Sequence, residues 1–321
     1  MQLLTKPKVV ISACLGYEKC RYNGEIFHNQ FLEKLKDMVQ FIPVCPETSI
    51  GLGVPREVIR IIYNTDGLSL YQPSTDKDLT KDMQSFSNHF VNHLPQVQGF
   101  ILKSKSPSCA YKDAKHYSGM EKGAHSVKGS GMFAQALKEH FPLYPFIDDG
   151  QLNDFKYREH FLIKLYMLSK LHQIAESVSL TQLIDFHNEN ELLIQCYSRL
   201  AYKELTAMLN TEINQHFADL VNAYSKRLLK ALEKVSRYTS NIGILRSSAQ
   251  SISPGMQPKE MRNIEDVIDK YKNGNLPFSV PLYVIKTYAL QYENQKLLRQ
   301  TIFDPFPADM MELRDSGKVR I

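Results

Sequence analysis

The sequence lacks the features of a membrane or secreted protein. It contains no stretch of about 18 consecutive apolar residues, so a membrane-spanning helix is not expected. The one short apolar stretch near the start follows Lys8 and indicates a β-strand rather than the apolar core of a signal peptide. We therefore expect a cytoplasmic protein with no membrane partner.

Cysteine is also scarce. The chain has 5 cysteines in 321 residues, and an odd number in so long a chain argues against a disulfide framework. In a reducing compartment such residues are buried small hydrophobes, catalytic thiols or metal ligands. A GxGxxG fingerprint is missing too, because Gly119, Gly123, Gly129 and Gly131 do not have its spacing. The net charge of +5 is only mildly basic and does not by itself indicate a nucleic-acid partner.

The composition is that of an ordinary globular protein, and the length predicts two domains. In the first half, strand-like segments alternate with helix-like ones. This alternation predicts an α/β domain, residues 1–152, with a mostly parallel sheet covered by helices on both faces. The expected strands are 8–13, 39–44, 58–63, 99–103 and 143–147, and the expected helices are 27–38, 80–94 and 132–140.

After about residue 150 nearly every segment has helical periodicity, which predicts an all-α domain over residues 153–321. The serine-rich stretch 247–258 is the one linker-like segment, and we expect it to be a mobile loop. The expected helices are 154–178, 180–188, 191–209, 212–232, 259–273 and 281–291.

Three cysteines follow the ends of predicted strands in the first half. Cys14 and Cys45 come directly after their strands, and Cys109 lies a few residues after a third. If these strands are parallel neighbours, the three thiols meet at the carboxyl edge of one sheet, where open α/β sheets place their ligand sites. Three thiolates at one point repel each other unless a cation is present, so this placement predicts an iron–sulfur or zinc centre with one open coordination position. The alternative is three separate buried cysteines.

The two remaining cysteines have weaker positions. Cys20 lies in the loop after Cys14 and can either complete a four-cysteine site or be a bystander, which is the interpretation we favour. Cys196 lies in an apolar helical segment and is expected in the core.

Two polar residues stand beside the predicted metal ligands. Glu47 follows Cys45 by two residues and can act as a general acid/base if burial raises its pKa. Ser106 precedes Cys109 in a Ser-Pro-Ser sequence, where its hydroxyl can position a substrate or donate to a cluster sulfur. The structural alternatives are a surface carboxylate or helix cap for Glu47 and turn formation for Ser106.

Five ordered motifs over residues 7–150 resemble the thiouracil desulfidase (TudS-like) family. They are SACLG at 12–16, CRYNG at 20–24, PVCPE at 43–47, GLGVPR at 51–56 and SPSCA at 106–110. The second half resembles a YbgA-like helical domain of unknown function, through FHNENELL at 186–193, RYTSNIGIL at 237–245 and GNLPFSVPLYVIKTY at 274–288.

The resemblance to the TudS-like family implies a [4Fe-4S] cluster held by Cys14, Cys45 and Cys109. It implies that the unligated iron binds the sulfur of a thiolated pyrimidine, and that Glu47 and Ser106 carry out the acid/base work. The implied reaction converts thiouracil and water to uracil and hydrogen sulfide, without net redox change.

A basic segment of the second half suggests a different partner. Lys226, Lys230, Lys234 and Arg237 have helical spacing and are expected to form one stripe that contacts RNA phosphates. The simpler alternative is a solvated helix face. Two other functions therefore stay open beside the desulfidase: an RNA-associated factor that processes thionucleosides, and a metal-binding regulatory protein without desulfidase activity.

Overall fold

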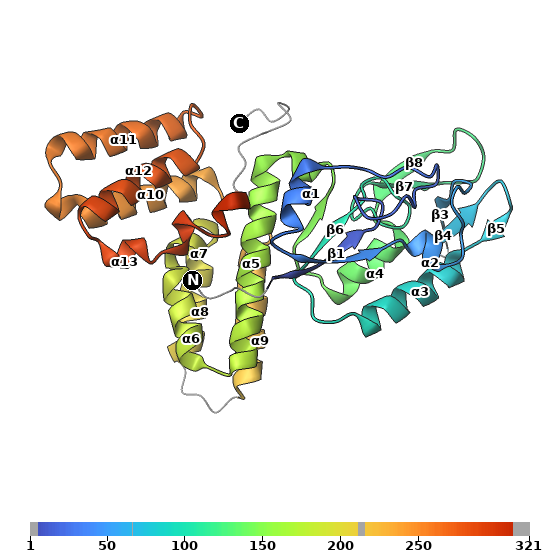
Figure 1. Cartoon of the computed structure of the whole chain (residues 1–321), viewed down its shortest axis with the longest axis horizontal. Coiled ribbons are helices and arrows are strands. Elements are labelled where there is room, and N and C mark those ends of the chain that lie inside the picture. The colour runs from blue at the N-terminus through green and yellow to red at the C-terminus, as the bar shows by residue number, and fades with distance from the viewer. Residues whose placement is uncertain (1–5, 66, 211–215, 311–321) are drawn as a thin grey trace. The chain divides into compact units, whose positions relative to one another are not determined.

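The computed structural model describes residues 6–65, 67–210 and 216–310 of the chain (Figure 1). The described residues divide into two compact units, the first ending at Leu165 and the second beginning at Tyr166. This division falls within helix α5, Phe155–Ser177. The domain boundary expected after residue 152 stays a prediction.

The first unit is built on a four-stranded sheet in which every neighbouring pair is parallel. Its strand order is β2-β1-β6-β9, with β1 spanning Lys8–Ser12, β2 Gln40–Val44, β6 Gly99–Leu102 and β9 Phe146–Asp148. These four strands correspond to four of the five expected ones. Their β-branched and apolar sequences are typical of a sheet that is buried on both faces.

Helices cover both faces of this sheet (Figure 1). Val10, Phe100 and Leu102 share one face and pack with buried residues of α3, Thr80–His93, and α4, Met132–His140. The residues that alternate with them point to the other face. Helix α5 covers that face so closely that a Cβ at Gly99 would meet the side chain of Leu165 in this helix. Helix α1, Gln30–Leu35, lies beside that part of α5 (Figure 1). The α/β architecture expected from the sequence is thus confirmed.

A second, five-stranded sheet was not expected. Its order is β5-β4-β3-β7-β8, and only the β3–β7 pair is parallel. The segment expected as a strand of the main sheet, 58–63, instead contributes β3 to this second sheet. One edge of β3 pairs with β4 in the antiparallel sense and the other with β7, so neither edge is free to join the main sheet. The strands are β3 Arg60–Asn64, β4 Gly67–Gln72, β5 Lys77–Asp78, β7 Ala114–Tyr117 and β8 Ser126–Gly129.

The second unit is helical throughout its described residues, as expected. Its helices after α5 are α6 Leu180–Glu189, α7 Glu191–Tyr197, α8 Arg199–Asn210, α9 Phe217–Ala231, α10 Tyr238–Ile252, α11 Pro258–Lys272, α12 Ser279–Gln291 and α13 Gln295–Leu298. Residues 212–215 of the expected helix 212–232 lie outside the described residues. The expected single helix 191–209 breaks at Ser198, whose extended backbone and side chain cap the start of α8.

The mobile loop expected over 247–258 was a wrong prediction, because α10 runs through it to Ile252. Leu245, Ser248, Ala249 and Ile252 are buried at helical spacing, so small serines form part of a packed helix face. The hydroxyl of Ser251 donates to the carbonyl of Ser248, which satisfies a polar group that otherwise favours loops.

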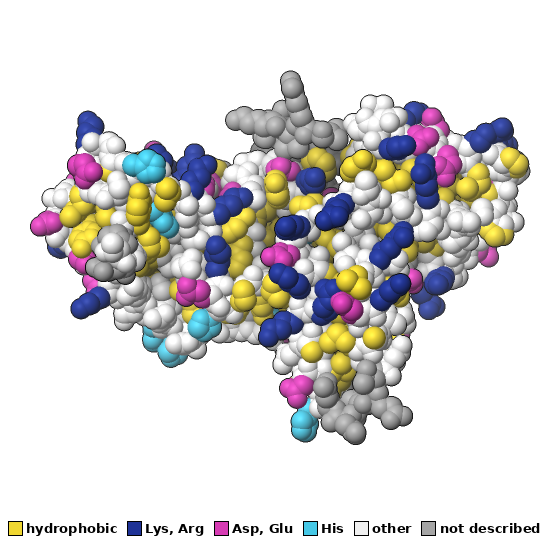
Figure 2. Space-filling model, turned by 180° about the vertical axis from the view of Figure 1, so that it is seen from behind, with side chains coloured by type: hydrophobic (Ala, Val, Ile, Leu, Met, Phe, Trp, Pro, Cys, Tyr) yellow, Lys and Arg dark blue, Asp and Glu magenta, His cyan; other side chains and the backbone are white. Residues whose placement is uncertain are grey.

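The basic stripe expected over Lys226–Arg237 is not continuous. Helix α9 ends at Ala231, so Lys226 and Lys230 lie on that helix while Lys234 and Arg237 follow it. Lys230 also forms an ion pair with Glu233 at 2.7 Å. On the face seen in Figure 2, lysine and arginine side chains of this unit have acidic side chains among them. None of the described helices is both long enough and apolar enough for a membrane crossing.

Candidate metal centre

The three cysteines at strand ends lie at the same edge of the parallel sheet. Strand β1 pairs with β2 on one side and β6 on the other, so Cys14, Cys45 and the Cys109 loop follow neighbouring strands. The amide of Ala13 donates to Val44 at 2.8 Å, which extends the β1–β2 pairing up to the two cysteines. The thiol of Cys109 is hydrogen-bonded to Ser12 at the end of β1, and the charge of Glu47 acts on it.

The loop that carries Cys109 is held by the start of α4. The amides of Met132 and Ala134 donate to the carbonyls of Pro107 and Ser108, both at 3.0 Å. The amide of Gly131 donates to Ala110 at 2.6 Å, and a Cβ at Gly131 would overlap the backbone of Ser108. Only glycine therefore allows the loop to pack this closely on the helix.

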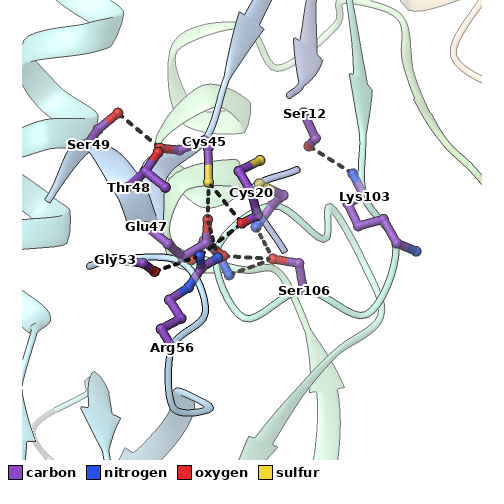
Figure 3. A network of polar contacts seen from close by, with 12 residues as sticks. Ser12, Cys20, Cys45, Glu47, Thr48, Ser49, Gly53, Arg56, Lys103 and Ser106 are labelled. Atoms are coloured by element: carbon purple, nitrogen blue, oxygen red, sulfur yellow. Dashed lines mark hydrogen bonds and ion pairs between the residues drawn. The ribbon is translucent and has the colours of Figure 1, made fainter. Parts of the chain in front are cut away.

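Glu47 and Ser106 meet beside the thiols (Figure 3). Glu47 lies in the short helix α2, Pro46–Ser49, where Pro46 occupies the first turn and Cys45 is the N-cap residue. The hydroxyl of Ser106 donates to Glu47 Oε1 at 3.4 Å and accepts from the amides of Ser108 and Cys109 at 3.2 and 3.0 Å. Cys45 Sγ donates to Glu47 Oε2 at 3.4 Å. The carboxylate is thus buried between a serine hydroxyl and a cysteine thiol.

Arg56 completes this polar cluster, and its position was not predicted. Its guanidinium donates to the carbonyl of Cys20 at 2.9 Å and lies 3.9 Å from Glu47 Oε2, with both charged side chains almost fully buried. A buried arginine requires acceptors and a counter-charge. The motif GLGVPR contained this residue, but the acceptor on Cys20 is 36 positions away in sequence.

Cys20 lies with the other thiols rather than apart from them. It is 4% exposed and forms one small buried cluster with Ala13, Cys14 and Cys45. Its side chain is hydrogen-bonded to those of Cys14 and Cys45. Cys20 thus lies beside the candidate ligands, and its interpretation as a bystander rather than a ligand stays a prediction. Cys196 is buried in helix α7 of the second unit, as expected.

The thiols at this edge have the chemistry of a site that needs a cation. The hydrogen bond to Cys14 raises the pKa of Cys20 to about 12. The pKa of Cys45 is raised by its hydrogen bond with Cys20 and by burial, and that of Cys109 by burial and the negative charge of Glu47. Without positive charge nearby, the raised pKa values keep the thiols of Cys20, Cys45 and Cys109 protonated, and a bound metal would reverse this.

The site also contains a buried hydroxyl that could hydrogen-bond to a bound cluster. The hydroxyl of Ser108, next to Cys109, is fully buried and has no hydrogen-bond partner among the described residues. Leaving such a group unpaired costs about 1–3 kcal/mol, so a cluster sulfur that accepts from it would be stabilised. No three His, Cys, Asp or Glu side chains of the described residues are placed to hold a single metal ion. The thiols that gather at this edge are the donor type that iron–sulfur clusters use.

The first half of the chain is similar to known proteins. A model of the 2-thiouracil desulfurase family matches residues 9–149. The uncharacterized protein YbbK of Bacillus subtilis (strain 168) is 30% identical over 153 residues, which make up 46% of this chain and 98% of YbbK. The chain belongs to the 2-thiouracil desulfurase family. All the candidate site residues, Cys14, Cys20, Cys45, Glu47, Arg56, Ser106 and Cys109, lie within the matched residues.

Two other known proteins and a second family model are also similar to parts of this chain. The uncharacterized protein YbgA of Escherichia coli (strain K12) is 26% identical over 159 residues, 49% of this chain and 93% of YbgA. A second family model, of a protein of unknown function (DUF1722), matches residues 191–307. The solved structure of the [4Fe-4S]-dependent thiouracil desulfidase TudS is 25% identical, with a TM-score of 0.38, over 46% of this chain and 93% of TudS.

Proposed function

We propose that this chain is a [4Fe-4S]-dependent desulfidase that removes sulfur from a thiolated pyrimidine base or nucleoside. Membership of the 2-thiouracil desulfurase family supports the substrate class. The observation that carries the proposal is the pair formed by buried Glu47 and half-buried Ser106. This pair touches Cys45 through a side chain and Cys109 through a backbone amide. Proton-transfer groups thus adjoin the thiols at the edge of the sheet.

In this proposal Cys14, Cys45 and Cys109 hold the cluster. When bound, the cluster supplies a thiophilic Lewis acid that polarises the C=S bond of the substrate. The hydrolysis exchanges that bond for C=O: the oxygen of water stays on the base, its two protons leave with the sulfur as hydrogen sulfide, and no electrons are gained or lost.

The chain's own residues move the protons. Glu47 accepts a proton from the attacking water and passes it to the departing sulfur, a role suited to a buried carboxylate. The hydroxyl of Ser106, fixed by two backbone amides, points its proton at Oε1 and holds the carboxylate in one orientation. The guanidinium of Arg56 lies 3.9 Å from Oε2 and forms an ion pair with the carboxylate of Glu47.

The test uses the full chain, purified and reconstituted without oxygen. Iron and acid-labile sulfide should be present, and 2- or 4-thiouracil should release hydrogen sulfide. Cys109→Ala should lose both iron and activity. Glu47→Gln should keep its iron but lose about 10²–10⁴-fold in rate, the usual contribution of an acid/base group. Glu25→Gln, at an exposed ion pair with Arg21, is the matched control and should resemble the wild type.

Other results would favour the alternatives. Sulfide release that survives Cys109→Ala would contradict the assignment of the ligands and of the activity. A colourless protein with stoichiometric zinc would favour a metal-binding regulatory protein. Activity on thiolated RNA without activity on a free base would favour an RNA-associated processing factor.

A further inference from the structure

The carboxyl ends of three neighbouring strands carry a chain of polar contacts that ends on the sulfur of Cys109. The strands are β1, β6 and β9, and the residues at or just past their ends are Ser12, Lys103 and Asp149. Ser12 and Asp149 are only 1% and 5% exposed. The proposed function uses none of these three residues, although they lie at the same edge of the sheet as the candidate ligands.

The contacts of Asp149 fix the backbone where β6 ends. One oxygen of its carboxylate accepts from the ammonium group of Lys103 and the other from the amide of Ser104, each at 2.7 Å. Because the acceptor is charged, both hydrogen bonds are of the strong, charge-assisted kind. Side chain and backbone are thus held together at this point, and the amide of Lys103 has a defined direction.

That amide donates to the hydroxyl of Ser12. The distance from the Lys103 nitrogen to Ser12 Oγ is 3.0 Å, and Figure 3 shows this contact beside the thiols. The last backbone pair of the β1–β6 ladder joins Ile11 and Ile101, so the hydroxyl continues the contact between the two strands past that pair. A serine oxygen that accepts a hydrogen bond still has its own proton to donate.

The hydroxyl of Ser12 has the sulfur of Cys109 as its partner. Burial raises the pKa of Cys109, and the hydrogen bond from Ser12 opposes that rise, as a donor to the thiolate does. A thiolate that binds a metal has no proton, so this hydrogen bond can run only from the hydroxyl to the sulfur. Ser106 also forms a hydrogen bond with this thiol, but its hydroxyl has Glu47 as a second acceptor.

We propose that Ser12 is a positioning residue for the cluster, whose hydroxyl donates to the thiolate of Cys109 and withdraws negative charge from it. This inference rests on the proposed function, because it requires Cys109 to hold the cluster. A donor to a cluster sulfur stabilises the extra negative charge of the reduced state, so Ser12 raises the reduction potential. The same withdrawal of electron density strengthens the attraction of the iron that lacks a protein ligand for the sulfur of the substrate.

The experiment measures the reduction potential of the reconstituted full chain in a redox titration followed by EPR. Ser12→Ala removes the donor and should shift the potential to a more negative value. Ser12→Thr keeps a hydroxyl and should restore the potential of the wild type. Ser87→Ala is the matched control, because Ser87 is also buried in the first unit but donates to the carbonyl of Met83 within α3. Its potential should equal that of the wild type.

A second measurement detects the hydrogen bond itself. In resonance Raman spectra, the Fe–S stretching frequencies of a cysteine sulfur that accepts a hydrogen bond shift when the protein is reconstituted in deuterium oxide. The wild type and Ser87→Ala should show this shift in full, and Ser12→Ala should lose part of it. If Ser12 only joined the ends of β1 and β6, its removal would not change this isotope effect.

The possible outcomes separate this inference from the proposed function. Equal potentials in the wild type and Ser12→Ala, with sulfide release intact, would overturn the role of Ser12 and leave the desulfidase proposal standing. A wild-type spectrum that does not change in deuterium oxide would overturn the inference even if Ser12→Ala failed to bind iron. Absence of iron from the wild type itself would end both proposals.

Discussion

At the scale of single residues, the loop that carries Ser106 and Cys109 depends on one missing side chain. Gly131 has no room for a Cβ, because its position would overlap the carbonyl of Ser108. The obstacle is backbone rather than a flexible side chain, so the loop or helix α4 would have to move. Ser106, which donates to the candidate base Glu47, and the candidate cluster ligand Cys109 would then change position.

Gly131→Ala should therefore destabilise the first unit by about 1–3 kcal/mol, the usual cost of overpacking, and should lower the iron content after reconstitution. Denaturation followed by circular dichroism and an iron assay measure the two effects; the chain has no tryptophan for fluorescence. The matched control is Gly53→Ala, because a Cβ at Gly53 meets nothing within 4 Å. Equal losses in both variants would show that the crowding at Gly131 does not matter.

The sequence predicted three thiols at one edge because parallel neighbouring strands end together, and that rule needs only the strand positions. Glu47 followed from its place beside Cys45. Cys20 and Arg56 could not be found in this way, since their positions depend on the path of loops. The contact that fixes both, from Arg56 to the carbonyl of Cys20, joins residues of two loops and has no periodic signal in the sequence.

At the scale of elements, helices α6, α8 and α9 are linked by a buried histidine. His187 Nδ1 lies 2.9 Å from the hydroxyl of Tyr224, and Nε2 lies 2.9 Å from Thr206 Oγ1. Thr206 donates its own proton to the carbonyl of Tyr202, so Nε2 must carry the ring proton and Tyr224 must donate to Nδ1. The neutral ring also stacks on Tyr202 at a centroid distance of 4.7 Å.

This arrangement predicts that the helical unit loses stability in mild acid. Burial lowers the pKa of His187 from 6.5 to about 4, so the unfolded chain binds the proton more readily than the folded one. The stabilisation is complete above about pH 6.5 and is lost as the pH falls through about 4, with a full value on the order of 3 kcal/mol. Thermal unfolding measured across this pH range is the test.

His187→Gln should flatten part of that pH dependence, because glutamine can donate and accept but does not titrate. His216→Gln replaces an exposed histidine before α9 and is the control. Burial also lowers the pKa of His172 in α5 to about 4, so some acid sensitivity should remain in His187→Gln. An unchanged pH profile in His187→Gln would contradict the role of this residue.

The contact of Lys226, Lys230, Lys234 and Arg237 with RNA stays a prediction. If these residues bind phosphates, replacing all four by glutamine should weaken binding of single-stranded RNA and reduce its dependence on salt by about 0.7 per lost contact. Filter binding over a range of salt concentrations measures this slope. The double variant of Lys226 and Lys230 has a control with the same change in net charge, the replacement of Lys270 and Lys286, which already pair with Asp266 and Asp304. Absence of binding even at low salt would leave these residues as a solvated surface.

Element type was predictable where periodicity is long and strong, as in α4, α5 and α11. The second sheet was missed because its strands are short and partly exposed, down to the two residues of β5, and lack a clear alternation. Helix α10 was missed for the opposite reason. Its serines resemble a linker in composition, and only packing against buried Leu245 and Ile252 makes that segment helical.

At the scale of the whole molecule, the two compact units contain different kinds of buried polar group. The thiols and Glu47 lie in the first unit, and the His187 network lies in the second. The two family models also match separate parts of the chain, residues 9–149 and 191–307. Conditions that act on thiolates therefore act on the first unit, and protonation of His187 acts on the second.

Removal of the cluster should consequently destabilise the first unit. A group that binds only the folded state stabilises it by mass action, and here binding would also give a partner to the buried Ser108 hydroxyl. Hydrogen exchange measured by mass spectrometry should show faster exchange after iron chelation in peptides that span β1, β2 and the Cys109 loop. Peptides of α6 and α8 should keep their exchange rates after chelation but exchange faster when the pH falls through the range in which His187 titrates, after correction for the intrinsic rate. If chelation instead accelerated exchange in α6 and α8 as much as in β1 and β2, the cluster would stabilise the chain as a whole, and its proposed confinement to the sheet edge would be contradicted.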